Sequence, residues 1–322
     1  MNKNKTILVT GGAGFIASNL SDALLKQGFR VIAVDNFDPY YDARIKKRNI
    51  EASLKHPNYK FVELDVRNTS ELTPLLKTEG VKHVCHLAAR AGVRPSLEEP
   101  IPYFEMNVRG TAALLEACRK SGVEKIVYGS SSSVYGAAKY LPIDEEHPTQ
   151  PLSPYAVSKL LAENLCQSYQ RIYGLNTVIL RYFTVYGPRQ RPDEAINKFL
   201  TQILKGEPIT VYGDGNQHRD FTYVSDIVKA TILAVQKATS NATLNIGSGK
   251  THTVNELLEI LGEITSKRIT KRHMERHTAD VEATWANIEK ARQVIGYEPD
   301  VNLKEGVKAF YNWLTSNQTT NT

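Results

Sequence analysis

The chain has 322 residues, of which 41% are hydrophobic and 23% charged, and its formal net charge is +6. This composition excludes an intrinsically disordered chain and leaves room for one large domain or two smaller ones. The sequence contains no apolar run near the about 20 residues that span a bilayer, and it enters a strand pattern without an apolar leader. We therefore expect a soluble cytoplasmic protein without a membrane partner.

Basic residues cluster at 46–48 and 267–273, and no row of aromatic residues accompanies them. This pattern favours solvated faces and a site for anionic phosphates over nucleic-acid binding. Cys85, Cys118 and Cys166 are odd in number and lie in apolar or helical segments. They predict buried thiols in a reducing compartment rather than a disulfide framework.

From the amino terminus, short β-branched runs alternate with helical patterns. Strands are expected over 6–10, 31–35, 61–65, 83–89, 125–131 and 177–182. Helices are expected over 17–28, from 41, from 70, over 107–121 and over 154–173. This alternation predicts an α/β fold with a doubly wound parallel Rossmann sheet. Ligands bind such sheets beyond the carboxyl ends of the strands.

After Arg181 the rhythm changes to turn-rich sequence, with helices expected over 196–205, 224–237 and 254–265. These segments hold too few strands for a second Rossmann sheet. We expect a Rossmann domain over 1–180 and a smaller α/β substrate lobe over 181–322. The boundary is approximate, because elements around 226–246 can pack back against the first domain.

The first strand leads into a glycine-rich turn and then a helix. Gly11 and Gly14 permit a tight turn that brings backbone N–H groups of the helix start, at Phe15 and Ile16, toward a pyrophosphate. The second strand ends at Asp35, whose carboxylate can accept hydrogen bonds from a ribose and repels a 2′-phosphate. The sequence therefore predicts an NAD site rather than an NADP site.

Residues that follow the third and fourth strands are also candidates for cofactor contacts. Asp65 and Val66 are expected beside the adenine. Leu87, Ala88 and Ala89 leave room for the cofactor.

Tyr155 and Lys159 stand four residues apart on a predicted helix, and therefore on one face. An ammonium group beside a phenol stabilises the phenolate and lowers the tyrosine pKa toward neutrality, which makes a general base. Four serines, 130–133, end the strand before this helix. The combination predicts a catalytic role for Tyr155, Lys159 and Ser131 or Ser132.

The chain resembles the extended short-chain dehydrogenases/reductases that act on nucleotide sugars. The matching segments are TGGAGFIAS, DNFD, HLAA, SSSSVYG, YAVSK, RYFTVYGPRQRP and YGDGNQHRDFTYVSD. The resemblance implies NAD in the first domain, with Asn36, Asn107 and Tyr182 among its contacts. It also implies a UDP-sugar in the second lobe and a homodimer built through helices near 101–120 and 154–172.

Within this family, HLAARAGVRPSLEEP, DNFDPYYDARIKKRN and RYFTVYGPRQRPDEAINKF are most similar to UDP-glucuronate 4-epimerases. The resemblance implies that Tyr155 takes the proton of the sugar 4-hydroxyl while C4 passes hydride to NAD. Ser131 or Ser132 would bind the same oxygen. The 4-keto sugar would turn over and receive the hydride on its other face.

The resemblance also suggests substrate contacts in the second lobe. Thr184, Arg191 and Arg94 are candidates to hold the sugar carboxylate, since a guanidinium can clamp it through two hydrogen bonds. The nucleotide and diphosphate are expected at Lys198, Phe199, Tyr212, Arg219, Arg276 and Asp280. Ala279 departs from the Gly-Asp pair of many relatives, and Ser133 stands where dehydratases and decarboxylases commonly carry a carboxylate.

Other functions remain open at this level. They include a UDP-glucose or UDP-N-acetylglucosamine 4-epimerase, a UDP-glucuronate decarboxylase, and a non-catalytic protein that senses NAD(H). His83, Cys85 and His86 have the composition of metal ligands, but neighbours on a strand point to opposite faces. We expect packing roles for them and no metal site.

Overall fold

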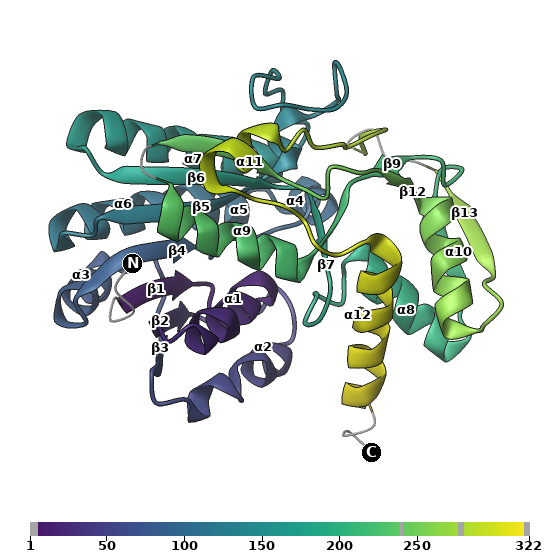
Figure 1. Ribbon diagram of the computed structural model, residues 1–322, viewed down its shortest axis with the longest axis horizontal. Helices are drawn as coiled ribbons and strands as arrows, with labels where there is room; N and C mark the ends of the chain where they lie inside the picture. Colours follow the sequence, from purple (N-terminus) through teal and green to yellow (C-terminus); the bar gives the residue numbers. More distant parts are fainter. Residues whose placement is uncertain (1–5, 239–240, 276–279, 319–322) are drawn as a thin grey trace.

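The computed structural model describes residues 6–238, 241–275 and 280–318. At its centre is a seven-stranded, entirely parallel sheet with the order β11-β6-β5-β4-β1-β2-β3 (Figure 1). Its strands are β1 (Thr6–Thr10), β2 (Arg30–Asp35), β3 (Tyr59–Glu63), β4 (Val81–His86), β5 (Lys125–Ser131), β6 (Asn176–Tyr182) and β11 (Ala242–Ile246). The first six strands follow the order of a Rossmann sheet, as predicted.

Helices cover both faces of this sheet and bury its β-branched side chains. One apolar core joins the sheet to α1 (Phe15–Lys26), α9 (Val224–Lys237) and α11 (Glu289–Ile295). A second core on the other face joins it to α3 (Thr69–Thr78), α6 (Gly110–Ser121) and α7 (Pro154–Tyr173). The strands are therefore apolar along nearly their whole length, as expected for a sheet covered on both faces.

A smaller lobe with its own apolar core lies at one end of the sheet, on the right in Figure 1. Its helices are α8 (Ala195–Lys205), α10 (Val254–Thr265) and α12 (Leu303–Gln318). Its short strands pair in two parallel sets and one antiparallel set: β7 (Thr184–Tyr186) with β10 (Phe221–Tyr223), β8 (Ile209–Tyr212) with β13 (Lys271–Met274), and β9 (His218–Arg219) with β12 (His252–Thr253). The second half of the chain also contributes to the Rossmann domain, because β11 is a strand of its sheet and α9 packs against that sheet. The division of the chain after residue 180 stays a prediction.

The helix predicted over 107–121 begins earlier. It comprises α5 (Ile101–Tyr103), a π-helical turn η2 (Phe104–Arg109) and α6, in direct succession. The wider π turn contains Asn107, whose amide bonds groups outside the helix. The remaining elements of the described chain are α2 (Ala43–Ile50), η1 (Ser53–Lys55), α4 (Val93–Glu98) and η3 (Ser132–Tyr135).

Cys85, Cys118 and Cys166 are free and buried, which confirms the prediction of buried thiols. Burial raises the pKa of the Cys85 thiol to about 12. Among the described residues, no helix combines the length and apolar character that a membrane crossing requires.

A buried ion pair fixes α7 to the sheet. The Glu163 carboxylate on α7 accepts hydrogen bonds from Arg181 Nε (3.0 Å) and Nη2 (2.7 Å) on β6. Ser130 Oγ on β5 donates to the same carboxylate at 2.5 Å. The side chains of Arg181 and Glu163 are 7% and 1% exposed, so each charge depends on the other.

We expect Glu163→Gln to lower the free energy of unfolding by about 3 kcal/mol, because the Arg181 charge would stay buried without its counter-charge. Chemical denaturation followed by circular dichroism measures the loss. Glu116→Gln is the matched control: Glu116 pairs with Arg119 and Lys120 at the surface and should barely shift the midpoint. Equal midpoints for the two variants would contradict the assigned role of the buried pair.

Candidate active site

A cavity of about 780 Å³ lies at the carboxyl ends of the parallel strands and is lined by both lobes. This volume suits a small-molecule ligand or cofactor. Most of the predicted site residues line it: Gly11, Gly14, Phe15, Ile16, Asp35, Asn36, Val66, Leu87, Ala88, Ala89, Arg94, Ser131, Tyr155, Lys159, Tyr182, Thr184, Arg191, Lys198, Phe199, Tyr212 and Asp280. Asp65, Asn107, Ser132 and Arg219 are not among the lining residues. Arg276 lies outside the described residues.

The glycine-rich turn has the geometry of a phosphate-binding loop. Gly11 has φ of +66°, and a Cβ there would lie 2.9 Å from the Ala88 Cα. Both the conformation and the close approach therefore require glycine. Gly14 precedes α1, and neither a capping side chain nor an acidic first-turn residue occupies the start of this helix. The exposed N–H groups and the helix dipole can hold an anion.

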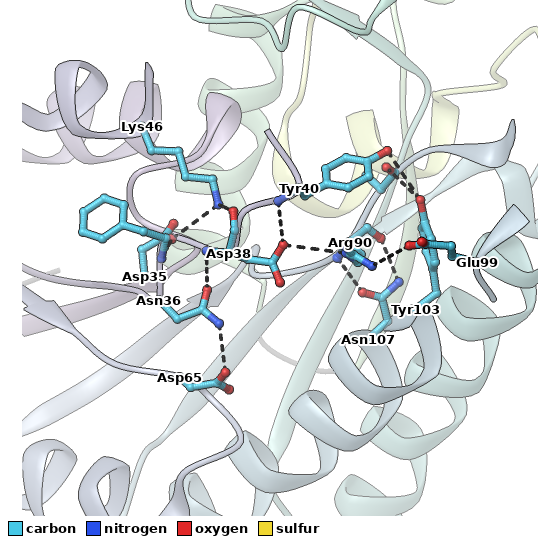
Figure 2. Close-up of polar contacts among 12 residues, drawn as sticks. Asp35, Asn36, Asp38, Tyr40, Lys46, Asp65, Arg90, Glu99, Tyr103 and Asn107 are labelled. Carbon is cyan, nitrogen blue, oxygen red and sulfur yellow. Dashed lines mark hydrogen bonds and ion pairs between the residues drawn. The ribbon is translucent and has the colours of Figure 1, made fainter. Parts of the chain in front are cut away.

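Asp35 connects this turn to the loop after β2, and Figure 2 shows its side chain beside Asn36 and Lys46. Its carboxylate accepts hydrogen bonds from Ala13 N (3.2 Å) and Phe37 N (2.8 Å). Lys46 Nζ lies 3.7 Å from the same carboxylate and donates to Asp38 O at 3.0 Å. Asp35 is 7% exposed and lines the cavity, so a free oxygen lone pair can face a ribose.

Asp65 lies outside the cavity lining and contacts Asn36, which is part of it. Its carboxylate accepts hydrogen bonds from Asn36 Nδ2 (2.8 Å) and from Arg67. The Arg67 hydrogen bond lowers the pKa of Asp65 to about 2. Asp65 thus orients Asn36, which lines the cavity, and its predicted adenine contact stays a prediction.

Asn107 has a similar supporting position. Its Oδ1 accepts from Arg90 N (2.8 Å), and its Nδ2 donates to Arg90 O (2.9 Å) and Ser158 Oγ (2.8 Å). Arg90 lies over the ring of Tyr40 at 5.1 Å, and its guanidinium is 3.7 Å from Asp38. Figure 2 shows this chain of contacts running from Asp35 to Arg90 and Asn107. These contacts hold the loop after β4, and the predicted cofactor contact of Asn107 stays a prediction.

Tyr155 and Lys159 reach the cavity from the first turns of α7. Ser153 caps the helix by accepting from Ala156 N at 3.2 Å. Lys159 Nζ donates to Gly129 O at 2.5 Å. Ser131 lines the cavity, lowers the pKa of Tyr155, and donates through Oγ to Ser133 Oγ at 3.0 Å, whereas Ser132 lies in η3 outside the lining. Of the two predicted serines, the structure therefore places Ser131 with the phenol.

The sequence predicted that the pKa of Tyr155 falls toward 7, and this prediction is wrong for the protein without bound NAD. Burial raises the pKa of Tyr155, while Ser131 and the Arg191 guanidinium oppose this rise. Burial also lowers the pKa of Lys159 to about 8, against the effect of Glu163. Both shifts favour the uncharged forms, because desolvation acts on each group.

Arg191 lies in the cavity beside Tyr40 and two acidic side chains. Its Nε and Nη2 each donate to Asp193 at 2.9 Å, and its Nη1 is 3.3 Å from Glu194. The guanidinium carbon is 5.4 Å from the centre of the Tyr40 ring. Arg191 also lowers the pKa of Tyr155 and lines the same cavity.

Arg94 bridges the two lobes across the cavity. It donates to Asp280 at 2.6 Å and stacks on Tyr212, with its guanidinium carbon 3.5 Å from the ring centre. Arg219, a predicted diphosphate ligand, donates to the carbonyl oxygens of Val281 (2.9 Å) and His218 (2.8 Å). It is not among the lining residues, and its contact with a diphosphate stays a prediction.

Several lining residues had no assigned role in the sequence. Tyr40 lies in the DNFDPYYDARIKKRN segment, so a signal for it existed. Arg90, Ser133 and Glu194 also line the cavity. The spacing of residues in the sequence did not identify Arg90 or Glu194 as cavity residues, because their positions depend on how loops from separate elements meet.

Comparisons with known proteins agree with this geometry. The family model for GDP-mannose 4,6 dehydratase matches residues 8–310. A UDP-glucuronate 4-epimerase from Thermodesulfobacterium geofontis is 42% identical over 96% of each chain.

Solved structures are similar over the whole fold. The UDP-glucuronic acid 4-epimerase from Bacillus cereus, in complex with UDP-glucuronic acid and NAD, is 39% identical, with a TM-score of 0.93 over 97% of this chain and 99% of that one. The UDP-glucose 4-epimerase from Thermotoga maritima, with UDP-glucose, is 34% identical, with a TM-score of 0.90 over 97% and 99% of the two chains. The chain therefore belongs to the GDP-mannose 4,6 dehydratase family, within the extended short-chain dehydrogenases/reductases.

Proposed function

We propose that the chain is an NAD-dependent 4-epimerase that interconverts UDP-glucuronate and UDP-galacturonate through a transient 4-keto sugar. One observation carries this proposal: Tyr155 and Arg191 line the same cavity, next to the glycine-rich turn. A phenol can exchange a proton with a sugar hydroxyl, and a guanidinium can hold a sugar carboxylate. The similarity to UDP-glucuronate 4-epimerases supports the same substrate.

The residues of the first domain fit NAD. The start of α1 can hold the pyrophosphate, and Gly11, where a Cβ would meet the Ala88 backbone, keeps the turn before this helix tight. Asp35 can accept hydrogen bonds from the adenosine ribose, while its charge disfavours a 2′-phosphate. Bound NAD would supply the hydride acceptor for sugar C4 and return the hydride to the opposite face. Proton transfer and substrate orientation fall to the protein.

Tyr155 is our candidate for the general base and acid at the sugar O4. Ser131 lines the same cavity as the phenol and can bind O4, which would align the proton for transfer. Lys159 is held by Gly129 O, so that its ammonium stays beside this part of the cavity. A cation there stabilises the phenolate that forms during transfer.

Arg191 and Thr184 are our candidates to hold the uronate carboxylate. Both line the cavity, and a bidentate guanidinium contact fixes the orientation of a carboxylate. The nucleotide would lie toward the second lobe, near Lys198, Phe199, Tyr212 and Asp280. Arg94 already contacts Tyr212 and Asp280, so we expect it to rearrange when a nucleotide enters.

A panel of UDP-sugars tests the proposal. Purified protein should convert UDP-glucuronate to UDP-galacturonate, as seen by NMR, without release of carbon dioxide. Arg191→His should lower kcat/KM for UDP-glucuronate about 10- to 100-fold, because a charge-assisted contact is lost, and should change UDP-glucose turnover much less.

Arg189→His is the matched control for Arg191, since Arg189 pairs with Asp22 outside the cavity lining. Conversion of only UDP-glucose or UDP-N-acetylglucosamine would assign a neutral-sugar epimerase instead. A pentose product with carbon dioxide would assign a decarboxylase. Binding of NAD(H) without turnover of any sugar would assign a sensor.

Tyr155→Phe should reduce epimerisation at least about 100-fold while leaving NAD bound, because only the phenolic hydroxyl that exchanges the proton is removed. Stopped-flow absorbance of reduced nicotinamide and NMR of the product measure the effect. Tyr128→Phe is the control: this buried hydroxyl on β5 has no hydrogen-bond partner among the described residues. A Tyr155→Phe enzyme with the activity of the Tyr128→Phe enzyme would remove Tyr155 from the proton transfer.

We also propose a homodimer built through α7 and the neighbouring α4 to α6. Leu97, Ile101, Leu161, Ile172 and Tyr173 are exposed apolar side chains of α4, α5 and α7. Single exposed apolar residues are common on protein surfaces, but these five lie on helices that contact one another. A second copy of the chain would cover them.

Leu161→Asp should convert the dimer to a monomer, because it places a charge in the proposed interface. Light scattering after size-exclusion chromatography should report twice the mass of the chain for the wild type and the single mass for the variant. Leu54→Asp on η1, which is also exposed, should remain a dimer. A monomeric wild type at micromolar concentration would exclude this proposal.

A further inference from the structure

Glu194 is the least compensated acidic group of the cavity. It precedes α8, and its Oε2 is buried without a hydrogen-bond partner among the described residues. Its Oε1 is 3.3 Å from Arg191 Nη1. Asp193 takes the other donors of the same guanidinium at 2.9 Å, but its side chain is 44% exposed against 28% for Glu194, so water solvates its charge better.

This arrangement creates a charge problem for an anionic substrate. Two acidic side chains already share the single positive charge of Arg191. A sugar carboxylate that reaches Arg191 would bring a third negative group to one guanidinium. Like charges within a few ångströms disfavour ionisation, and the carboxylate that water solvates least is the first to take up a proton. By that criterion Glu194 is protonated before Asp193.

We propose that Glu194 takes up one proton from solvent when the uronate carboxylate binds at Arg191. The proton converts the Glu194 carboxylate to a carboxyl group, and no bond of the substrate changes in this step. The new O–H turns the unpartnered oxygen into a donor that can point at the uronate. This inference rests on the proposed function, because only a uronate brings the third charge.

Other charged and titratable groups around Glu194 agree with this assignment. Burial raises its pKa, Arg191 lowers it, and Asp193 raises it further. Tyr41, from the loop before α2, and Tyr155, from α7, each have their pKa raised in part by Glu194. Both phenols are therefore neutral at pH 7 and cannot accept a proton, which leaves the carboxylates of Glu194 and the more exposed Asp193.

Isothermal titration calorimetry tests the proposal. The NAD-loaded Tyr155→Phe enzyme, which binds without turnover, is titrated with UDP-glucuronate in phosphate and in Tris between pH 6 and pH 9. The difference in heat between the buffers gives the protons taken up. We expect uptake to pass about half a proton per site at its maximum, and Kd to rise up to about tenfold per pH unit in that range. UDP-glucose, which has no carboxylate, should bind with little uptake.

Two further variants on the same background locate the proton. Glu194→Gln should abolish the uptake and flatten the pH dependence of Kd, whereas the neighbouring Asp193→Asn should keep both. Infrared difference spectra with UDP-glucuronate labelled with ¹³C at its carboxyl group give a second measurement without altering Glu194. A protonated carboxyl band that the label does not shift belongs to the protein.

The outcomes separate the two proposals. Binding of UDP-glucuronate without proton uptake, uptake that survives Glu194→Gln, or a carboxyl band that moves with the label would overturn the role of Glu194 alone. Binding of UDP-glucose but not of UDP-glucuronate would overturn the uronate specificity and, with it, this inference.

Discussion

Parallel strands in one sheet all end at the same edge, and this geometric constraint brings the reactive groups together. The ends of β1, β2 and β5 deliver Gly11, Asp35 and Ser131 to one cavity, although they are far apart in sequence. The second lobe faces the same edge and adds Arg191 from the loop before α8. A dinucleotide and a second ligand can therefore meet there without any change in the sheet.

The same arrangement removes charged groups from water, and each charge needs a partner inside the protein. Arg181 and Glu163 form an ion pair, and Lys159 donates a hydrogen bond to a backbone carbonyl. Arg191 has more acidic partners than its charge requires. Fully paired charges hold the scaffold rigid, whereas the unbalanced cluster lies where a substrate anion could enter.

The fold was predictable because it depends on local patterns. Alternating β-branched runs and helices predicted the parallel sheet, and the turn with Gly11 and Gly14 predicted the phosphate cradle. The four-residue spacing of Tyr155 and Lys159 placed both side chains on one face of α7, as the structure shows. These inferences needed only residues close together in the chain.

What the sequence did not predict depends on contacts between distant loops. Asn107 and Asp65 proved to support Arg90 and Asn36 rather than to line the cavity, because a motif fixes a position along the chain and not the direction of a side chain. The pKa of Tyr155 was misjudged for a related reason. Pair spacing reports a neighbouring charge, but desolvation depends on everything packed around the phenol.

A 4-keto uronate gives the pairing of Arg191 with a carboxylate a further chemical consequence. Such an intermediate loses carbon dioxide readily, since the ketone is β to the carboxylate and accepts its electrons as the bond breaks. A guanidinium contact stabilises the negative charge while it remains on the carboxylate, and so raises the barrier to moving that charge onto the ketone. An O–H donor from Glu194 would act in the same direction, because it too binds the charge where it starts. An epimerase for uronates therefore gains from a cluster that holds the carboxylate firmly, and the acidic neighbours of Arg191 supply a way to do so without excess positive charge beside the phenol of Tyr155.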